Sequence, residues 1–581
     1  MIYLCDSELV LEEYLSNENI SLSNVFTCSP NIIRNFKEVN QFDARWDTHS
    51  LKEFQESIKI SLEKIDSYLD DQLGKNKYTA LITSVRFFRD VYKLMGIDQK
   101  KLDGAITQIK YKNSKKDPRL AHVDFRWKEY LEGVCRFSEV DVELSNVDDL
   151  FTKDGKITLI EKLKLKSMKQ TLFKIGKRFI RGKKGKVYFY RENELLNDAL
   201  AEMFFNGYEV QSIKPSSEKG VELSQESNDK ILQVGEYIFE TIFKDLIVEE
   251  LVPNSKEVFK NDLIAAYKEN SSYTKSWSEL VKQMNLEKDF IFCGYTSIPA
   301  MLSLAALDKR PALVSFQHGI SKELSDQYDE IDCMSDGNIS EVCFFYNNEV
   351  RKVEEANRFF SAKAVVSGAS SSHHKIKRKN KKAPPKKIVY LSTNLYRGNL
   401  GLFVSSENDS LQSEFEYELV KNSLSKIDSG VDYKAYPMTT LRYLEKDYVL
   451  KEVIKHQNIN LVEEKKDVRY FLRDYNLIIT THATSTLSWP VFSDIPTVFI
   501  DKSYNKTIKP ELKDLMSEAL FVFDESEENF HELLADFINS DLDKIESAWK
   551  AKEASRKKLV DQYFSTEISQ KKVFLNTLEN L

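Results

Sequence analysis

A cluster of hydroxyl-bearing residues follows the apolar run Leu477–Thr480 and precedes a short predicted helix. Its polar members are Thr481, His482, Thr484, Ser485 and Thr486. Both this run and the later run 497–500 are continuously apolar, which is typical of parallel strands covered on both faces. Hydroxyl and backbone N–H groups can bind an anion where such a strand ends and a helix begins. The segment therefore predicts a phosphate pocket; the alternative is that residues 484–486 only cap the helix.

Histidines at strand ends are the next candidates. His318 follows the apolar stretch ALVSF and precedes Gly319, so we expect its ring at the edge of a sheet. A histidine pKa of ~6.5 suits proton transfer or hydrogen bonding to phosphate. A local turn contact is the alternative, and both interpretations apply equally to His482. His373 and His374 lie in a basic, Ser-rich segment and are predicted to be solvated.

Carboxylates could serve as the base or the nucleophile of a transfer reaction. Glu192 and Glu194 come directly after the apolar strand 187–190, where they could reach a cleft. The competing carboxylates, downstream of the QHG turn, are Asp326, Asp329 and Asp332. The alternative for each of them is a solvated surface position, because the chain is acidic.

Polar turns follow predicted strands in both halves of the chain. The expected acceptor-side turns contain Gly294, Thr296, Gln317 and Gly319. The expected donor-side turns contain Ser392, Thr393, Asn394, Tyr436 and Pro437, in addition to the 481–486 cluster. The carboxyl ends of two such sheets would enclose a ligand cleft. This arrangement suits a group transfer from which water is excluded.

Alternating strand and helix patterns predict an α/β protein with two Rossmann-like domains that face a cleft. The predicted parts are an N-terminal α/β region that belongs to the acceptor half (1–156), a basic amphipathic helix (157–186), an acceptor-side domain (187–368), a linker (369–385), a donor domain (386–540) and a C-terminal bridging helix (541–581). The segment YTALITS, residues 78–84, is predicted to be a strand.

The helix predicted at 157–186 combines an apolar stripe with many basic residues. The stripe is Leu165, Met168, Leu172, Ile175 and Phe179. A basic amphipathic helix is typical of an element that binds an anionic membrane surface, here the inner membrane. The alternative is a helix packed on the protein core with a solvated basic face.

Composition excludes several classes of protein. The 581 residues are 41% hydrophobic and 30% charged, as expected for a globular protein of two or three domains. A net charge of −7 argues against nucleic-acid binding. The N-terminus does not resemble a signal peptide, and no apolar run is long enough to span a bilayer, so we expect a cytoplasmic location.

The pattern of motifs excludes further chemistries. The six cysteines are scattered along the chain and no two of them form a CxxC pair. This pattern predicts buried free thiols rather than disulfides. No residues have metal-ligand spacing, so no metal site is predicted. The sequence contains no GxGxxG after a strand, no GxxxxGK[ST] and no GxSxG, which argues against NAD binding, P-loop chemistry and an α/β-hydrolase.

The order of segments in the chain resembles the GT-B glycosyltransferases of bacterial capsule and O-antigen assembly. The segments are a strand followed by FQHG, then FYNNEVRKVEEANRFFSAKAVVSGAS, KKIVYLSTN, KAYP, and a late strand followed by ATSTL and IPTVFID. The chain is most similar to Kdo and sialic acid transferases that use CMP-activated donors, and to the related CDP-glycerol transferases. The similarity covers about residues 186–501.

The resemblance implies that Thr484, Ser485 and Thr486 bind donor phosphate or nucleotide. The family's His-Pro turn, which has the same role, is replaced here by Tyr436-Pro437. A tyrosine hydroxyl can donate a hydrogen bond but cannot become a cation. This departure leaves the donor open and admits a non-catalytic homologue. Some retaining Kdo transferases use a carboxylate nucleophile, a role open to the carboxylates named above.

The function implied by the resemblance is a metal-independent glycosyltransferase with a nucleotide-sugar substrate and no cofactor. CMP-Kdo or a related CMP-nonulosonate is the favoured donor, and a bacterial surface polysaccharide or lipid-linked glycan is the acceptor. No DxD motif follows an apolar strand, so basic and hydroxyl groups are expected to bind the phosphate. The alternatives are a CDP-polyol phosphotransferase and a non-catalytic glycan-binding or assembly protein of the same fold.

Overall fold

The structure is a computed structural model of the 581-residue chain. It describes residues 2–5, 7–41, 48–88, 109–112, 137–139, 166, 168–176, 183–247, 252–325, 336–376, 386–392, 409–436, 447–462, 466–502 and 508–581. Several residues singled out from the sequence lie outside these ranges: Asp326, Asp329, Asp332, Thr393, Asn394, Pro437, Leu165 and Phe179.

The first Rossmann-like domain contains a six-stranded parallel sheet in the order β11-β10-β9-β8-β6-β7. Its strands are β6 (Gly185–Tyr190), β7 (Tyr208–Ser212), β8 (Phe290–Cys293), β9 (Ala312–Phe316), β10 (Val342–Phe345) and β11 (Lys363–Val366). The inner strands β8, β9 and β10 are almost entirely buried, as the continuous apolar runs predicted, whereas the edge strands β7 and β11 are partly exposed. The helices of this domain include α8 (Glu194–Phe205), α9 (Gln225–Ile238), α10 (Val252–Ser271), α11 (Thr274–Val281), α12 (Pro299–Ala305) and α13 (Asn348–Glu355).

The second domain contains another six-stranded parallel sheet, in the order β14-β13-β12-β15-β16-β17. Its strands are β12 (Ile388–Leu391), β13 (Val431–Lys434), β14 (Ile459–Leu461), β15 (Leu477–Thr480), β16 (Thr497–Asp501) and β17 (Phe521–Asp524). The strand order reverses between β12 and β15, which is where doubly wound sheets bind ligands. Its helices include α14 (Asp409–Asn422), α15 (Tyr448–Val453), α16 (Ser485–Phe492), α17 (Lys513–Ala519) and α18 (Phe530–Asn539).

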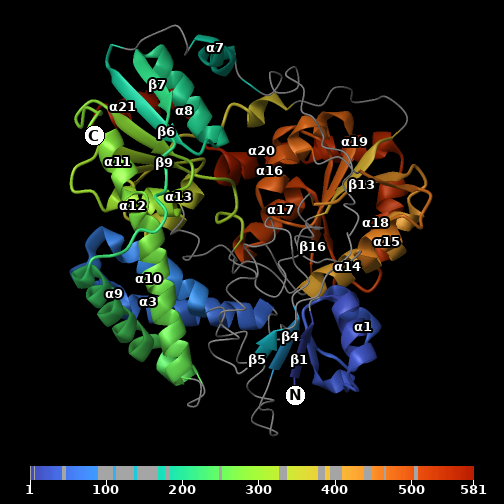
Figure 1. Ribbon diagram of the computed structural model, residues 1–581. Helices are drawn as coiled ribbons and strands as arrows, with labels where there is room; N and C mark the ends of the chain where they lie inside the picture. The colour runs from blue at the N-terminus through green and yellow to red at the C-terminus, as the bar shows by residue number, and fades with distance from the viewer. Residues whose placement is uncertain are drawn as a thin grey trace.

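The C-terminal segment returns from the second domain to the first. Helices α19 (Leu542–Ala551) and α20 (Glu553–Leu559) pack beside the second sheet, whereas α21 (Gln570–Leu578) packs on the first (Figure 1). Phe574 of α21 is fully buried, with its ring centroid 4.9 Å from that of Phe344 in β10. Two Rossmann-like domains joined by this returning segment form the GT-B fold that was predicted.

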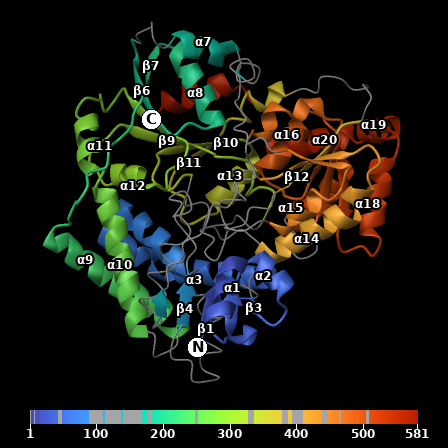
Figure 2. The same cartoon turned by 45° about the vertical axis from the view of Figure 1, so that its right-hand side comes forward.

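A third parallel sheet near the N-terminus has the order β3-β2-β1-β4-β5. Its strands are β1 (Ile2–Cys5), β2 (Val25–Thr27), β3 (Asn40–Gln41), β4 (Ile109–Lys112) and β5 (Phe137–Glu139), and its helices are α1 (Glu8–Asn17) and α2 (Pro30–Asn35). Helix α2 lies beside α14 of the second domain (Figure 2). Arg34 of α2 lies 3.7 Å from the centroid of the Tyr417 ring on α14. This sheet therefore contacts the second domain, although the sequence assigned the whole region to the acceptor half.

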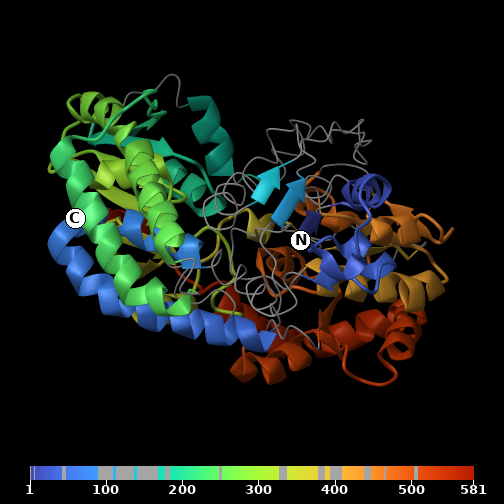
Figure 3. The same cartoon turned by 60° about the horizontal axis from the view of Figure 1, so that its bottom comes forward.

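In contrast to the N-terminal sheet, the long helix α3 (Thr48–Leu73) lies against the first domain, where it runs beside α9 and α10 (Figure 3). Residues 77–88, which follow it, form a helix rather than the strand predicted at 78–84. Tyr78, Leu81, Val85 and Phe88 are buried at helical spacing. The β-branched residues of YTALITS suggested a strand. The apolar residues, however, continue beyond that segment at a spacing of three to four positions, which favours a helix.

The basic amphipathic segment is described only in part, as helix α7 (Met168–Gly176). Phe173 is buried against Phe204 of α8, whereas Met168 and Leu172 are 75% and 48% exposed. The described part of the predicted apolar stripe therefore points away from the core. Among the described residues, no helix has both the length and the apolar composition needed to cross a bilayer.

Four of the six cysteines are described: Cys5, Cys28, Cys293 and Cys343. All four are buried and free, as predicted.

Candidate functional site

A cavity of about 550 Å³ lies between the carboxyl ends of the two six-stranded sheets. Predicted site residues from both domains line it: Glu192, Glu194, His318, Gly319, Ser392, Tyr436, Ser485 and Thr486. We call it the interdomain cavity. The structure thus brings together residues that lie almost 300 positions apart in the chain, as expected for facing sheet edges.

The turn after β6 presents both predicted glutamates. Arg191 has a left-handed backbone, with φ of 54°, and its carbonyl accepts a 3.0 Å hydrogen bond from the backbone N–H of Gly294. Such a conformation is costly for a residue with a side chain and persists only where the surroundings enforce it. Asn193 then caps α8 through a 2.8 Å hydrogen bond from the backbone N–H of Leu196. Glu192 is exposed in the cavity.

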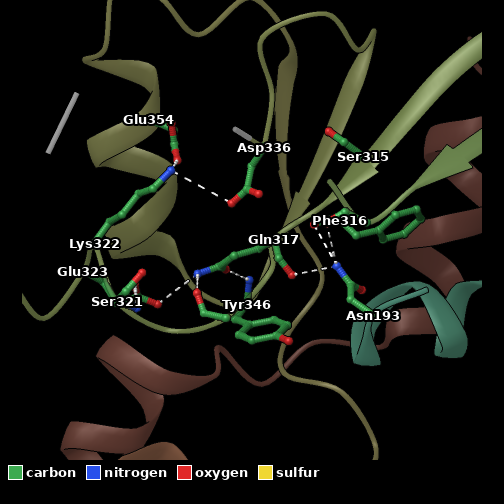
Figure 4. Close-up of polar contacts among 12 residues, drawn as sticks. Asn193, Ser315, Phe316, Gln317, Ser321, Lys322, Glu323, Asp336, Tyr346 and Glu354 are labelled. Carbon is green, nitrogen blue, oxygen red and sulfur yellow. Dashed lines mark hydrogen bonds and ion pairs between the residues drawn. The ribbon is translucent and has the colours of Figure 1, made fainter. Parts of the chain in front are cut away.

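Gln317 does not line the cavity but bonds the segments around the turn before His318. Figure 4 shows its hydrogen bonds. Its Oε1 accepts a 2.9 Å hydrogen bond from the backbone N–H of Tyr346, and its Nε2 donates to the carbonyl of Gly319 at 2.9 Å. Asn193 donates to the carbonyls of Phe316 and Gln317 at 3.0 and 3.2 Å. These bonds fix the strand end, and the exposed His318 side chain lines the cavity.

Two other predicted acceptor-side residues lie behind the cavity. Thr296 is fully buried. A Cβ on Gly294 would lie 2.6 Å from the carbonyl oxygen of Arg191. Together with Gln317, these residues shape the turns but do not line the cavity.

The 481–486 cluster divides into two groups. Thr484 is the N-cap of α16, as the alternative interpretation held, and accepts from the backbone N–H of Thr486 at 3.4 Å. Ser485 and Thr486 line the cavity, whereas Thr481 is buried and neither it nor His482 lines it. A Cβ on Gly319 would lie 3.1 Å from the Cβ of Ser485, so the two domains approach closely here.

Three cationic side chains on the second domain line the cavity but were not identified from the sequence: Lys434, Lys466 and Arg469. Lys434 ends strand β13, and a search for basic residues at strand ends would have found it. Arg469 lies in the short helix η12 (Val468–Tyr470), which comes after strand β14 but not directly at its end, so no strand-end motif marked this residue. Within the described residues, no three His, Cys, Asp or Glu side chains come together as a metal site.

Arg469 joins the two domains by an ion pair with Glu194. Its Nη2 also contacts Asp467 Oδ2 at 2.7 Å. The second oxygen of Glu194 accepts a 3.0 Å hydrogen bond from Ser372 Oγ. Because both of its carboxylate oxygens are bonded, Glu194 is less suited than Glu192 to act on a substrate.

The prediction that His373 is solvated is wrong. Its side chain is 3% exposed, and its ring stacks on Trp489 of α16 with centroids 3.9 Å apart. Burial lowers the pKa of His373 to about 3, and the positive charges of His374 and Arg469 act in the same direction. His373 is therefore a neutral part of the cavity wall, because the chain crosses between the domains here instead of forming a free linker.

A buried carboxylate lies behind Ser392. Glu416 of α14 accepts 2.8 Å hydrogen bonds from Ser392 Oγ at both oxygens, and also accepts from the hydroxyls of Tyr390 and Tyr433. Burial raises the pKa of Glu416 to about 7, although these hydrogen bonds oppose the shift. The network orients Ser392 at the cavity wall. Glu416 was missed because it lies within a helix, away from any predicted turn.

No family model and no curated protein matches the chain. Among solved structures, the chain is similar to HepE of Anabaena, solved with UDP and glucose (TM-score 0.36, 11% identity, 69% of this chain and 100% of that one). It is also similar to the glycosyltransferase SnogD of Streptomyces nogalater (TM-score 0.36, 10% identity, 68% and 100%). A third is the spinosyn rhamnosyltransferase SpnG, solved with thymidine diphosphate (TM-score 0.31, 12% identity, 68% and 99%). At these TM-scores the likeness adds nothing to what the sheets themselves establish.

The burial of neutral His373 predicts a loss of stability on acidification. Its pKa in the folded chain is about 3, below the ordinary value of ~6.5, so its stabilising contribution is complete above pH 6.5 and falls as the pH approaches 3. The slope reaches at most about 1.4 kcal/mol per pH unit. We expect His373→Gln to have a lower Tm at pH 8, because stacking on Trp489 is lost, but a shallower fall in Tm between pH 7 and pH 5.

The matched control is His318→Gln, which makes the same substitution at an exposed histidine of the same cavity. Calorimetry of the three proteins across this pH range measures both slopes. An unchanged slope in His373→Gln would contradict the assignment.

Proposed function

We propose that the protein is a glycosyltransferase that binds a nucleotide-activated sugar in the interdomain cavity and transfers the sugar to a glycan acceptor. The observation that carries the proposal is the lining of this cavity. Hydroxyl and cationic groups come from the second domain, whereas an accessible histidine and an accessible carboxylate come from the first. Donor and acceptor would thus be bound by different domains, with the transfer between them.

The donor phosphates would lie against the second domain. Ser485 and Thr486 lie at the N-terminus of α16, where the helix dipole favours an anion. Lys434, Lys466 and Arg469 would neutralise the phosphate charge. With these groups present, charge neutralisation would not require a metal ion. Tyr436 would donate a hydrogen bond in place of the histidine of the similar family.

The acceptor would be activated from the first domain. Both His318 and Glu192 are exposed and line the cavity. Within the described part of the chain, Glu192 has no ion pair or hydrogen bond, so its oxygens are available to a substrate. We assign Glu192 as the carboxylate of the reaction and His318 as a hydrogen-bonding or proton-transfer group beside it.

The sequence resemblance favours CMP-Kdo or a related CMP-nonulosonate as the donor. It also favours a bacterial surface polysaccharide or lipid-linked glycan as the acceptor, assembled at the cytoplasmic face of the inner membrane. A CDP-polyol phosphotransferase would use the same phosphate pocket. The accessible Glu192 beside the expected phosphate pocket is compatible with an enzyme, because a transfer to a hydroxyl acceptor needs a carboxylate or other base within reach.

Nucleotide binding is the direct test of the donor pocket. A ligand that binds only the folded protein raises its stability by RT ln(1 + [L]/Kd), which is about 2.7 kcal/mol at one hundred times Kd. We expect CMP or CDP to raise the Tm more than UDP or GDP in a thermal-shift screen. Selective stabilisation by UDP or GDP would remove the CMP-sugar assignment, and no shift with any of the four would contradict the enzymatic proposal.

Removal of single hydroxyl groups distinguishes a phosphate pocket from a helix cap in the same screen. Ser485→Ala and Thr486→Ala should each weaken nucleotide binding by about tenfold or more, because a hydrogen bond to a charged group contributes about 1.5–3 kcal/mol. Thr484→Ala is the matched control: it should lower the Tm of the free protein as a lost cap, by about 1 kcal/mol of unfolding free energy, and should leave the nucleotide affinity nearly unchanged.

Substitution of the two glutamates tests the catalytic assignment. Glu192→Gln should lower kcat by about 100-fold or more with an almost unchanged donor Kd, because it removes the carboxylate and keeps the shape. Glu194→Gln should instead weaken donor binding with only a small change in Tm, because Arg469 loses a partly exposed partner in the other domain. Measurement of kcat, donor Kd and Tm for both variants separates these effects. A larger loss of kcat in Glu194→Gln would reverse the assignment.

We propose in addition that α7 binds an anionic membrane surface. Met168 and Leu172 are exposed on the face opposite Phe173, which packs on α8. Lys174 is also exposed, and the segment 157–186 is rich in lysine and arginine. A basic residue near an anionic leaflet contributes about 1 kcal/mol, and inserted apolar side chains add to this. The helix would bring the protein to lipid-linked acceptors.

Vesicle co-sedimentation tests this role of α7. We expect binding to vesicles that contain anionic lipid, with less binding at high salt. The double variant Met168→Ser/Leu172→Ser should lose most of the binding. Leu533→Ser, at a leucine of α18 that is 46% exposed, is the control and should bind like the wild type. Binding of the double variant at the wild-type level, or no binding of the wild type, would contradict the proposal.

A further inference from the structure

A second cavity, of about 260 Å³, lies beside the interdomain cavity. Its wall includes Lys166, Lys174, Glu194, Ser372, Arg469 and Tyr470. Glu194 and Arg469 also line the interdomain cavity, so their ion pair forms a partition between the two. We call the smaller space the α7 cavity, because helix α7 and the residue Lys166 just before it form one side of it.

The charge of the α7 cavity is positive. Lys166, Lys174 and Arg469 face a single carboxylate, that of Glu194. Arg469 and Ser372 already occupy both oxygens of this carboxylate. Lys174 has no ion pair in the part of the chain that the structure describes. An anion could therefore enter without breaking an ion pair of Lys174.

Lys174 lies on helix α7, which is fixed to the first domain, and Lys166 lies just before this helix. Phe173 packs on Phe204 of α8, with ring centroids 5.4 Å apart. Gln170 Nε2 donates a 2.8 Å hydrogen bond to Asp198 of the same helix. Asp198 also accepts 2.6 Å hydrogen bonds from the backbone N–H and the hydroxyl of Ser371. Helix α7, helix α8 and the segment around Ser371, where the chain crosses between the domains, thus form one side of the cavity together.

One further lysine of α7 provides a contrast. Lys169 forms a 2.6 Å ion pair with Glu202 of α8 and does not line the cavity. The same short helix therefore carries one lysine whose charge is paired within the protein and another, Lys174, that lines the cavity without an ion pair to the described residues. This difference is expected of a binding group and not of a uniformly solvated basic face.

We infer that the α7 cavity is a second anion-binding subsite and that it binds a phosphate group of the acceptor. The identification of the ligand as the acceptor rests on the proposed function, whereas the binding of an anion does not. The cavity shares Arg469 with the donor side, so an occupant would lie next to the group that is transferred. Lysines bind phosphate as point charges, and a phosphate linked to a membrane lipid would reach this site from the helix that we expect at the membrane.

Binding of inorganic pyrophosphate, measured by isothermal titration calorimetry, tests the inference. The interdomain cavity is first filled with the nucleotide that the thermal-shift screen selects, or left empty if none binds. We expect the wild type to bind pyrophosphate and Lys174→Gln to bind it about tenfold more weakly. Lys169→Gln is the matched control and should bind like the wild type, since it removes one positive charge from the same helix without touching the cavity.

A second pair of variants locates the binding. Ser485→Ala and Thr486→Ala alter the interdomain cavity alone and should leave pyrophosphate binding unchanged. If they abolish it while Lys174→Gln does not, the anion binds in the interdomain cavity and the inference is wrong. No binding by the wild type, or an equal effect of Lys169→Gln and Lys174→Gln, would also overturn it. Tighter binding of glucuronate than of pyrophosphate would overturn the assignment to phosphate.

These outcomes are independent of the proposed function. If no nucleotide binds and pyrophosphate binding still depends on Lys174, the subsite stands and the glycosyltransferase proposal fails. If nucleotides bind and pyrophosphate binding is indifferent to Lys174, the glycosyltransferase proposal stands and the subsite fails.

Discussion

The ion pair between Glu194 and Arg469 fixes one contact between the two halves of the interdomain cavity. It connects the first turn of α8 to the short helix η12, and no other ion pair among the described residues links the walls of the cavity across the domains. Both side chains are partly exposed, so the pair by itself stabilises the protein little. Its contribution is geometric: a planar guanidinium bonded to both Glu194 and Asp467 holds one orientation.

The chain crosses between the two domains at two places that support this arrangement. The first crossing contains Gly368 and His373, and the second, before α21, contains Ser565. The crossings bond to each other, since the backbone N–H of Ala369 donates to Ser565 Oγ at 2.8 Å. Gly368 has φ of +80°, and a Cβ there would lie 2.9 Å from the carbonyl oxygen of Thr566. A glycine is required at this approach. Because the domains are connected twice, we expect any closure to be small and to occur about these crossings.

The sequence predicted the two facing sheets and much of the cavity lining because both depend on local signals. A continuous apolar run that ends in a polar turn places residues such as His318 and Ser485 at a sheet edge, whichever other elements surround it. Arg469 and Glu416 carry no such signal, since they reach the site through tertiary packing of a short helix and of a helix interior. His373 was misjudged for the opposite reason: a Ser-rich basic composition suggests a linker, but the ring stacks on Trp489 once the domains meet. The N-terminal sheet likewise docks through Arg34 and Tyr417, a contact between distant segments that no local pattern reveals.

Arg469 contacts both walls of the interdomain cavity, which differ in charge. The cations Lys434 and Lys466 lie on the second domain, and the accessible Glu192 lies on the first. Arg469 belongs to both cavities and bonds the carboxylates of Glu194 and Asp467 at the same time. A lysine would offer a single charged nitrogen in place of the planar guanidinium fork, so it would hold the two carboxylates with less directional geometry. Arg469 is therefore the residue that an anion in either cavity would contact. Binding of a ligand in one cavity would then change the anion affinity of the other.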